Sequence, residues 1–257
     1  MSAADNGNGR PVVLITGGSR GIGAATAVRA ARQGMDVAIS YRTERAAAAA
    51  VSEAVTAASG AELFAVQADV AEEADVLALF EAVIDRFGRL DALVNNAGIA
   101  AAQQPVAEYT LARIERLFAV NITGSFLCAR EAVRRMSTMR GGRGGAIVNV
   151  SSAASRLGSP NEFVDYAASK GAIDSMTIGL AKEVAGEGIR VNAVRPGLIE
   201  TQIHAAIGEP DRVASRAHQV PMQRGGSADE VAETIVWLIS PASSYVTGAL
   251  LDVAGGR

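Results

Sequence analysis

A tyrosine and a lysine four positions apart, Tyr166 and Lys170, have the residue types and the spacing for proton transfer. Residues four apart share one face of a helix, so a phenol and an ammonium can address the same ligand there. Lys170 and Lys182 are the only lysines among 24 basic residues, which indicates a need for a compact ammonium rather than a planar guanidinium at this position. A free phenol has a pKa of about 10, and a neighbouring positive charge lowers that pKa toward the range useful for acid and base catalysis.

Two serines, Ser151 and Ser152, follow an apolar run at 147–150. Ligands of open α/β sheets bind at the carboxyl ends of the strands, which is where these serines would lie. A hydroxyl group there can donate a hydrogen bond to a substrate carbonyl and stabilise charge on its oxygen. Taken alone, the pair favours the alternative of a capping role at the start of a loop.

A glycine-rich run at 16–23 separates a predicted strand from a predicted helix. Its glycines Gly17, Gly21 and Gly23 let the backbone approach a pyrophosphate closely, and the helix amino terminus offers free N–H groups and a positive dipole end. By itself such a run is also compatible with a tight turn. The order of strand, glycine turn and helix favours a dinucleotide site.

The elements that must position these residues alternate regularly along the chain. Short apolar runs predict strands at 12–16, 37–41, 63–67, 92–94, 146–151, 190–194 and 249–252. Longer segments with helical periodicity predict crossover helices at 21–33, 43–59, 72–87, 110–138, 163–187 and 228–239. This α/β alternation predicts a single domain, residues 11–257, with a doubly wound parallel sheet of about seven strands and helices on both faces, a Rossmann fold.

Together these motifs resemble the short-chain dehydrogenase/reductase family, and the resemblance extends from about Pro11 to Gly256. Bacterial 3-oxoacyl-acyl-carrier-protein reductases and glucose 1-dehydrogenase-like members are the most similar by overall pattern. The catalytic residues that the resemblance implies are Asn121, Ser152, Tyr166 and Lys170. The cofactor-binding residues that it implies are Gly17, Ser19, Arg20, Gly21, Ile22, Gly23, Tyr41, Arg42, Asp69, Val70, Asn95, Ala97, Gly98, Tyr166, Lys170, Pro196, Gly197, Ile199 and Thr201.

The resemblance implies hydride transfer between NADP(H) and a substrate that alternates between a carbonyl and a secondary alcohol. Tyr166 would supply or accept the proton as general acid/base, Ser152 would polarise the carbonyl, and Lys170 would tune Tyr166. Asn121 would help to hold a water near Lys170, with an interior helix amide bonded to a local partner as the alternative interpretation. The alternative function is a non-enzymatic NADP(H)-binding sensor, which the loss of Ser152, Tyr166 or Lys170 would have favoured.

The end of the second predicted strand favours NADP(H) over NAD(H). An NAD enzyme places an acid there to bond the ribose 2′-hydroxyl, whereas this chain has Tyr41 and Arg42. The resemblance makes Arg20 a second basic position for a 2′-phosphate, which guanidinium groups bind through charge-assisted hydrogen bonds. Asp36 and Glu44 are expected to lie away from that phosphate. The alternative is that both arginines are merely exposed charges.

Composition narrows the remaining possibilities. The net charge of −3 and the lack of a basic run predict no nucleic-acid partner, and the resemblance implies a small-molecule carbonyl or alcohol substrate. The single cysteine, Cys128, suits a buried core position and a reducing compartment, which predicts a cytoplasmic protein. No apolar stretch has the length of a membrane span, and His204 and His218 lack partners at metal-ligand spacing, so neither a membrane nor a metal is expected. Residues 1–10 are expected to form a flexible amino terminus.

Three further expectations concern the periphery of the site and the assembly. Residues 202–224 are polar and lack a clean period, which predicts a substrate lid. Arg195 is interpreted as a surface charge, with a guanidinium at the substrate mouth as the alternative. The resemblance also implies a homotetramer, assembled through the helices at 110–138 and 163–187 and through the closing strand.

Overall fold

The central sheet consists of strands that are apolar on both faces, as parallel strands between two helical layers require. The computed structural model describes residues 9–257. Within them, the main sheet is parallel and has seven strands in the order β3-β2-β1-β4-β5-β6-β9. Its strands are β1 Val12–Ile15, β2 Asp36–Tyr41, β3 Leu63–Gln67, β4 Ala92–Asn95, β5 Gly145–Val150, β6 Ile189–Pro196 and β9 Leu250–Val253. The predicted doubly wound sheet is confirmed, and each predicted strand overlaps an observed one.

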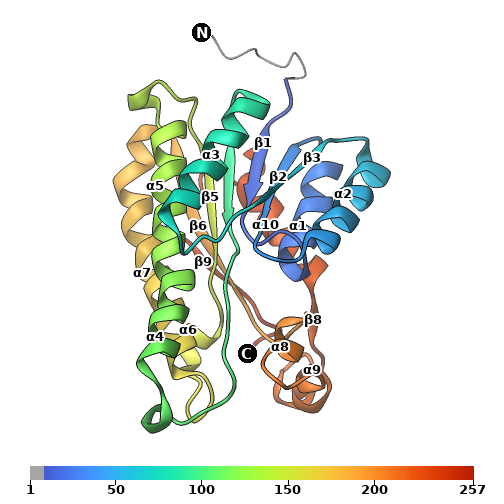
Figure 1. Cartoon of the computed structure of the whole chain (residues 1–257), viewed down its shortest axis with the longest axis vertical. Coiled ribbons are helices and arrows are strands. Elements are labelled where there is room, and N and C mark those ends of the chain that lie inside the picture. Colours follow the sequence, from blue (N-terminus) through green and yellow to red (C-terminus); the bar gives the residue numbers. More distant parts are fainter. Residues whose placement is uncertain (1–8) are drawn as a thin grey trace.

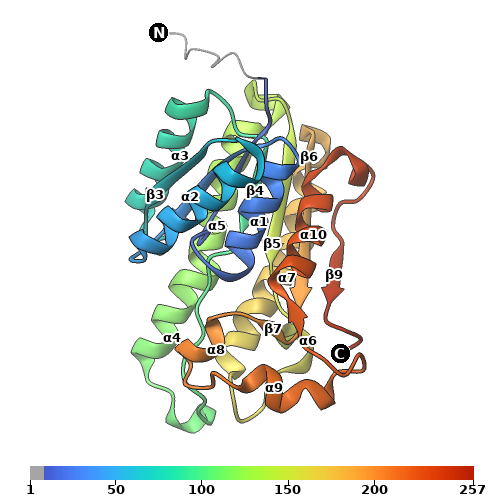
Figure 2. The ribbon, with the colours of Figure 1, turned by 90° about the vertical axis from the view of Figure 1, so that its right-hand side faces the viewer.

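Helices cover both faces of this sheet, as Figure 1 and Figure 2 show. The helices are α1 Gly21–Arg32, α2 Arg45–Ser59, α3 Glu73–Phe87, α4 Leu111–Phe118, α5 Gly124–Met136, α6 Ala154–Leu157, α7 Val164–Val184, α8 Ile203–Ala206, α9 Arg212–Arg216 and α10 Ala228–Ile239. Helices α1, α2 and α10 lie on one face, and α3, α5 and α7 lie on the other. The structure is therefore a three-layer α/β/α domain.

β1 shows why the strands are continuously apolar. Val13 and Ile15 pack toward α1 and α10, whereas Val12 and Leu14 pack toward α3 and α5. All four side chains are buried. Alternate residues of a strand point to opposite faces of a sheet, so a strand covered on both faces needs apolar residues at every position.

The long helix predicted at 110–138 is interrupted. A π-helical turn over Ala119–Thr123 joins α4 to α5. Such turns are rare and occur frequently at functional sites. Hydrophobic periodicity does not predict this turn, because the helix continues on both sides of it.

The segment predicted as a lid contains more structure than its sequence pattern indicates. Two short strands, β7 Ile199–Glu200 and β8 Gly226–Ser227, pair with each other and bracket it. Helices α8 and α9 lie between them. Elements of two to five residues are too short to show a hydrophobic period, so the sequence does not reveal them.

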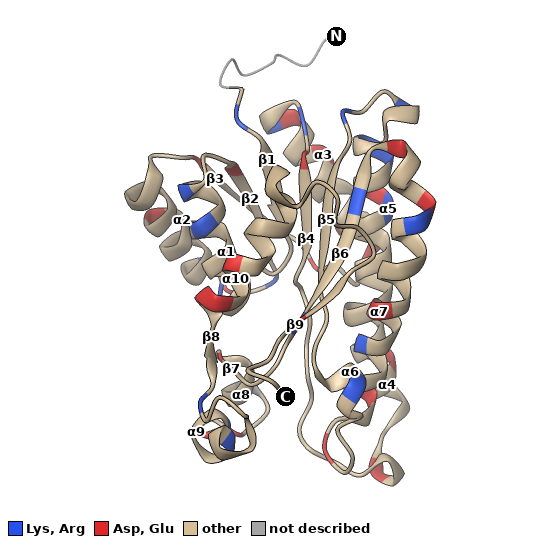
Figure 3. Ribbon diagram, turned by 180° about the vertical axis from the view of Figure 1, so that it is seen from behind, with Lys and Arg blue, Asp and Glu red and all other residues tan. Residues whose placement is uncertain are grey.

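The chain order reverses at the centre of the sheet, where β1 lies between β2 and β4. Loops that leave β1 and β4 at their carboxyl ends diverge from this point, and such a switch point is where doubly wound sheets bind ligands. Figure 3 shows that the sheet is mostly free of charge, while Lys, Arg, Asp and Glu lie mainly on helices and loops. No helix within residues 9–257 has the length and apolar character to cross a membrane.

The prediction that residues 1–10 form a flexible amino terminus stays a prediction, because residues 1–8 lie outside the described part of the chain. Arg10 pairs with Asp36 at the start of β2, with 3.7 Å between the charged atoms. Asp36 therefore lies at the opposite end of β2 from Tyr41, as expected.

Candidate active site

A cleft of about 650 Å³ lies at the carboxyl edge of the sheet. Its walls come from the glycine turn after β1, the ends of β2, β4, β5 and β6, helix α7 and the segment around α8 and α9. Most of the predicted site residues line it: Gly17, Ser19, Arg20, Gly21, Ile22, Tyr41, Arg42, Asp69, Val70, Ala97, Gly98, Ser152, Tyr166, Lys170, Pro196, Gly197, Ile199 and Thr201. Gly23, Asn95 and Asn121 are not among the residues that line it.

The glycine turn has the shape expected of a phosphate cradle. Gly17 and Gly21 have positive φ angles of 62° and 54°, which side chains rarely adopt. A Cβ atom at Gly23 would lie 2.6 Å from both the Asn96 amide nitrogen and the Gly17 carbonyl oxygen. Arg20 precedes α1 in an extended conformation without capping the helix through its side chain, so the amino terminus of α1 can offer its N–H groups to a phosphate.

Asn96 holds this turn against the end of β4. Its side-chain nitrogen donates to the carbonyl oxygens of Thr16 and Gly17, both at 2.9 Å. The sequence predicts its neighbour Asn95 as a cofactor-binding residue, but Asn95 is buried, does not line the cleft, and donates to Asn149 Oδ1 and the Ser125 carbonyl. Asn95 is the last residue of β4 and Asn96 follows it, so the two adjacent asparagines contact different parts of the structure.

Three predicted catalytic residues meet on one wall of the cleft. Tyr166 and Lys170 lie one turn apart on α7, and Ser152 follows β5. The Ser152 hydroxyl acts on the Tyr166 phenol and favours its ionised form. Lys170 is buried, donates from Nζ to the Val150 carbonyl at 2.7 Å, and has its Nζ 5.6 Å from the centre of the Tyr166 ring.

Burial controls the electrostatics of this wall. It raises the pKa of Tyr166 above its ordinary value, while the Ser152 hydroxyl acts in the opposite direction. Burial also lowers the pKa of Lys170 to about 8, and the charge of Asp174 opposes this change. The expectation that protein charges lower the Tyr166 pKa is therefore not met, because desolvation outweighs the neighbouring groups.

Asn121 adjoins the site without lining the cleft. It lies in the π-helical turn, where its Oδ1 accepts from the Ile99 N–H at 2.8 Å. Its Nδ2 donates to the Ile99 carbonyl at 2.9 Å and to Ser169 Oγ at 3.1 Å. The side chain is fully buried, and these contacts match the alternative interpretation of an interior amide with local partners.

Two arginines, Arg20 and Arg42, line the cleft. Within residues 9–257, their guanidinium groups make no hydrogen bond or close ion pair with a described residue, although the charge of Arg42 acts on the Asp69 carboxylate. Glu44 also lines the cleft and directly precedes α2, and the expectation that this carboxylate lies away from a 2′-phosphate stays a prediction. Asp69 lines it as well, but its carboxylate accepts a hydrogen bond from Arg116 at 2.7 Å.

The segment around α8 and α9 closes the cleft opposite α7. Arg212 and Arg216 both donate to Glu162, which precedes α7, at 2.5 Å. The Arg212 guanidinium also lies 5.0 Å from the centre of the Phe163 ring. These cleft-lining residues were missed at the sequence level because their pairing joins distant segments.

Comparison with known proteins identifies the family. A family model described as Enoyl-(Acyl carrier protein) reductase matches residues 17–257. Uncharacterized oxidoreductase YgfF of Escherichia coli is 56% identical, covering 96% of this chain and 99% of its own. The structure of a short-chain dehydrogenase/reductase from Serratia marcescens has a TM-score of 0.87 and 34% identity, covering 96% of this chain and 97% of its own. This chain belongs to the short-chain dehydrogenase/reductase family.

Other relatives of this short-chain dehydrogenase/reductase include both predicted subgroups. Glucose 1-dehydrogenase 2 of Bacillus subtilis is 36% identical, covering 95% of this chain and 93% of its own. A 3-oxoacyl-[acyl-carrier-protein] reductase of Synechocystis is 38% identical, covering 95% and 96%. A 3-ketoacyl-(acyl-carrier-protein) reductase from Brucella melitensis, solved with NADH, has a TM-score of 0.87 and 35% identity, covering 96% and 98%. The family assigns this chain to pyridine-nucleotide-dependent redox chemistry on carbonyl and alcohol groups.

Arg195 differs from its predicted role in this short-chain dehydrogenase/reductase. The interpretation as a surface charge is wrong, because its side chain is only 15% exposed and donates twice to Asp174 Oδ2, at 2.8 and 3.1 Å. It does not line the cleft either. Arg195 instead anchors Asp174, the carboxylate whose charge acts on Lys170.

Metal and cysteine chemistry find no support in the described chain. Within residues 9–257, no group of three or more His, Cys, Asp or Glu side chains could hold a metal ion. Burial raises the pKa of the Cys128 thiol to about 12. A thiol with so high a pKa is a poor nucleophile, and Cys128 packs among the residues of the core beside α3 and α5.

Proposed function

We propose that this chain is an NADP(H)-dependent oxidoreductase that interconverts a carbonyl and a secondary alcohol, with Tyr166 as general acid/base. The observation that carries the proposal is the convergence of Ser152, Tyr166 and Lys170 on one wall of the cleft, facing the glycine turn. Gly17, Gly21 and Gly23 permit the tight turn by which the backbone can approach a dinucleotide pyrophosphate. The residues present therefore fit the cofactor.

The chain's own groups provide binding, orientation and proton transfer. When bound, the nicotinamide supplies or accepts the hydride. Ser152 donates a hydrogen bond to the carbonyl oxygen while Tyr166 donates its proton, and the raised pKa keeps Tyr166 protonated for this role. The Lys170 ammonium stabilises the phenolate that remains. General acid catalysis of this kind contributes about 10²- to 10⁴-fold in rate.

The preference for NADP(H) rests on Arg20 in the glycine turn and Arg42 after β2, which line the cleft and make no side-chain hydrogen bond or close ion pair within residues 9–257. A 2′-phosphate would pair with them, and each charge-assisted bond contributes about 1.5–3 kcal/mol. We therefore expect NADPH to bind at least about 10-fold more tightly than NADH. The NADH in the Brucella melitensis structure makes the opposite outcome a definite alternative.

Dissociation constants for NADPH and NADH on the parent protein and on Arg42→Ala test this preference. Arg42→Ala should weaken NADPH about 10-fold or more and leave NADH nearly unchanged. Arg45→Ala serves as the matched control, because Arg45 is nearby in the chain but does not line the cleft. Equal affinities on the parent, or equal losses for both cofactors in Arg42→Ala, would show that these arginines do not recognise the phosphate.

The relatives named above differ in substrate, from glucose to acyl thioesters on a carrier protein, so the proposal includes no single substrate class. A panel of ketones, sugars and acyl thioesters, with NADPH consumption as the readout, tests the reaction and its substrate together. We expect turnover in at least one class. Consumption of NADPH by none of them, despite tight NADPH binding, would support the sensor instead.

We further propose a cytoplasmic homotetramer. The exposed apolar residues Phe126 on α5 and Ile178 on α7 support assembly through these helices, which lie side by side in Figure 1. The lone buried thiol of Cys128 is consistent with a reducing compartment.

A further inference from the structure

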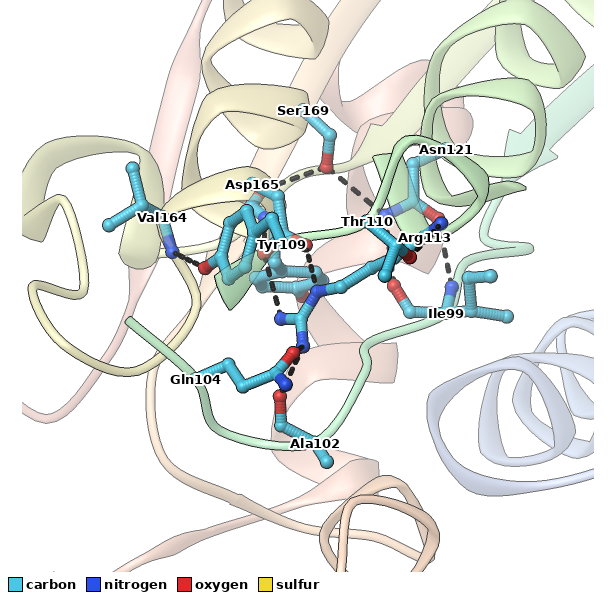
Figure 4. A network of polar contacts seen from close by, with 11 residues as sticks. Ile99, Ala102, Gln104, Tyr109, Thr110, Arg113, Asn121, Val164, Asp165 and Ser169 are labelled. Carbon is cyan, nitrogen blue, oxygen red and sulfur yellow. Dashed lines mark hydrogen bonds and ion pairs between the residues drawn. The ribbon is translucent and has the colours of Figure 1, made fainter. Parts of the chain in front are cut away.

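Arg113 connects three segments around the amino end of α7. Its Nε donates to Asp165 Oδ2 at 2.7 Å, and Nη2 reaches Asp165 Oδ1 at 3.3 Å. Its Nη1 donates to the Ala102 carbonyl at 2.7 Å and to Gln104 Oε1 at 2.8 Å. Figure 4 shows this guanidinium between helix α4, the loop around Gln104 and the start of α7.

The same network holds the backbone on which Tyr166 stands. Asp165 Oδ1 accepts from the Tyr166 N–H at 2.9 Å. One turn further along, Ser169 Oγ donates to the Tyr166 carbonyl at 2.7 Å and accepts from Asn121 at 3.1 Å. Both polar groups of the Tyr166 backbone are therefore tied to side chains, and Figure 4 shows Asp165 near Arg113 and Ser169 near Asn121.

The first turn of α7 lacks the usual local cap. Phe163 precedes this helix and makes no side-chain capping bond. The Val164 N–H instead donates to the Tyr109 hydroxyl at 3.1 Å, and the Arg113 guanidinium stacks 4.2 Å from the centre of the Tyr109 ring. The amino end of the helix that carries Tyr166 and Lys170 is thus held by residues preceding and within α4.

The ion pair between Arg113 and Asp165 is buried, so its charges lose the stabilising contact with water. The Asp165 side chain is 2% exposed and that of Arg113 is 11% exposed. Burial by itself raises the pKa of Asp165, yet the bonds from Arg113 and from the Tyr166 N–H hold that pKa below its ordinary value. Buried ion pairs commonly add little to stability compared with apolar side chains of the same size, so stability alone does not account for the pair.

We propose that Arg113 and Asp165 are positioning residues that fix Tyr166 relative to the substrate wall of the cleft. The proposal rests on the function proposed above. Ile99 and Ala100, in the loop that Arg113 holds at Ala102, line the same cleft as Tyr166. The ion pair therefore sets the distance between the proton donor and the loop against which a substrate lies, and misplacement by about 1 Å can cost about 100-fold in rate.

Asp165→Asn is the primary test. Asparagine can still accept from the Tyr166 N–H but loses the ion pair. We expect kcat to fall about 10- to 100-fold, with the dissociation constant for NADPH unchanged within about threefold. Hydrogen exchange should become faster in peptides covering 99–105 and 161–170.

Asp91→Asn is the matched control. Asp91 also accepts from a backbone N–H, that of Val12 at 2.7 Å, and from Nε and Nη2 of one arginine, Arg89. It precedes β4 at the end of the sheet opposite the cleft. Asp91→Asn should lower Tm while leaving kcat and the exchange of 161–170 near the parent values.

The double variant Arg113→Met/Asp165→Asn separates positioning from stability. It leaves no buried charge unpaired, so Tm should recover relative to Asp165→Asn while kcat stays low. Recovery of kcat together with Tm, or an unchanged kcat in Asp165→Asn, would overturn the proposal. If the parent turns over no substrate, or Tyr166→Phe keeps its activity, the proposed function fails. The exchange data then decide alone, and parent-like exchange of 161–170 in Asp165→Asn would overturn the positioning role.

Discussion

Burial changes the pKa of Lys170, and through it the charge beside Tyr166. Its ammonium is buried among the Val150 carbonyl, Gly98 and Asn121, and burial brings its pKa down to about 8. Below that pH Lys170 is charged and can stabilise a phenolate on Tyr166. Above it Lys170 is neutral, and the stabilisation disappears.

NADPH-driven reduction should therefore fall as the pH rises through about 8. A profile of kcat/KM against pH, measured on any substrate found in the panel, checks this midpoint. Asp174→Asn removes the negative charge that raises the Lys170 pKa, so the midpoint should move to lower pH. A flat profile through this range, or a midpoint unaffected by Asp174→Asn, would count against the role of Lys170.

At the scale of elements, the glycine turn and α7 could be predicted because their signals are local. Gly17, Gly21 and Gly23 lie within one turn, and Tyr166 and Lys170 lie four apart on one helix. The partners of distant segments could not be predicted in this way. Arg195 on β6 donates to Asp174 on α7, and no hydrophobic periodicity in either segment predicts that contact.

The π-helical turn at Ala119–Thr123 was missed for a related reason. Its consequence is long-range, since it presents Asn121 to Ile99 and Ser169, while the apolar period of the flanking helices continues. The ion pairs of Glu162 with Arg212 and Arg216 could not be predicted either, because the sequence shows the charges but not which of them meet.

Gly23→Ala tests the tight contact between the turn and β4. The new methyl would clash with Asn96 and the Gly17 carbonyl at 2.6 Å. We expect a loss of about 1–3 kcal/mol in stability and loss of NADPH binding, measured by denaturant unfolding and cofactor titration. Gly186→Ala is the control, because nothing lies within 4 Å of a Cβ there. Gly23→Ala with parent-like NADPH affinity would mean that this packing does not shape the cradle.

At the scale of the whole molecule, assembly is the feature that the sequence itself specifies least. A homotetramer through α5 and α7 predicts that Phe126→Glu combined with Ile178→Glu yields smaller species in light scattering, because buried charges oppose association. Met139→Glu is the control, since Met139 is exposed but lies beyond the end of α5. A parent protein that is monomeric at micromolar concentration would contradict the tetramer.

The central claim is that one phenol, on a helix held at the edge of a parallel sheet, carries the proton of a carbonyl reduction. Its most direct test compares NADPH consumption by the parent and by Tyr166→Phe on a substrate that the parent reduces. The account predicts that Tyr166→Phe loses about 10²- to 10⁴-fold or more in rate, while NADPH binding stays within a few-fold because only one hydroxyl is removed. Retention of most of the activity by Tyr166→Phe would contradict it.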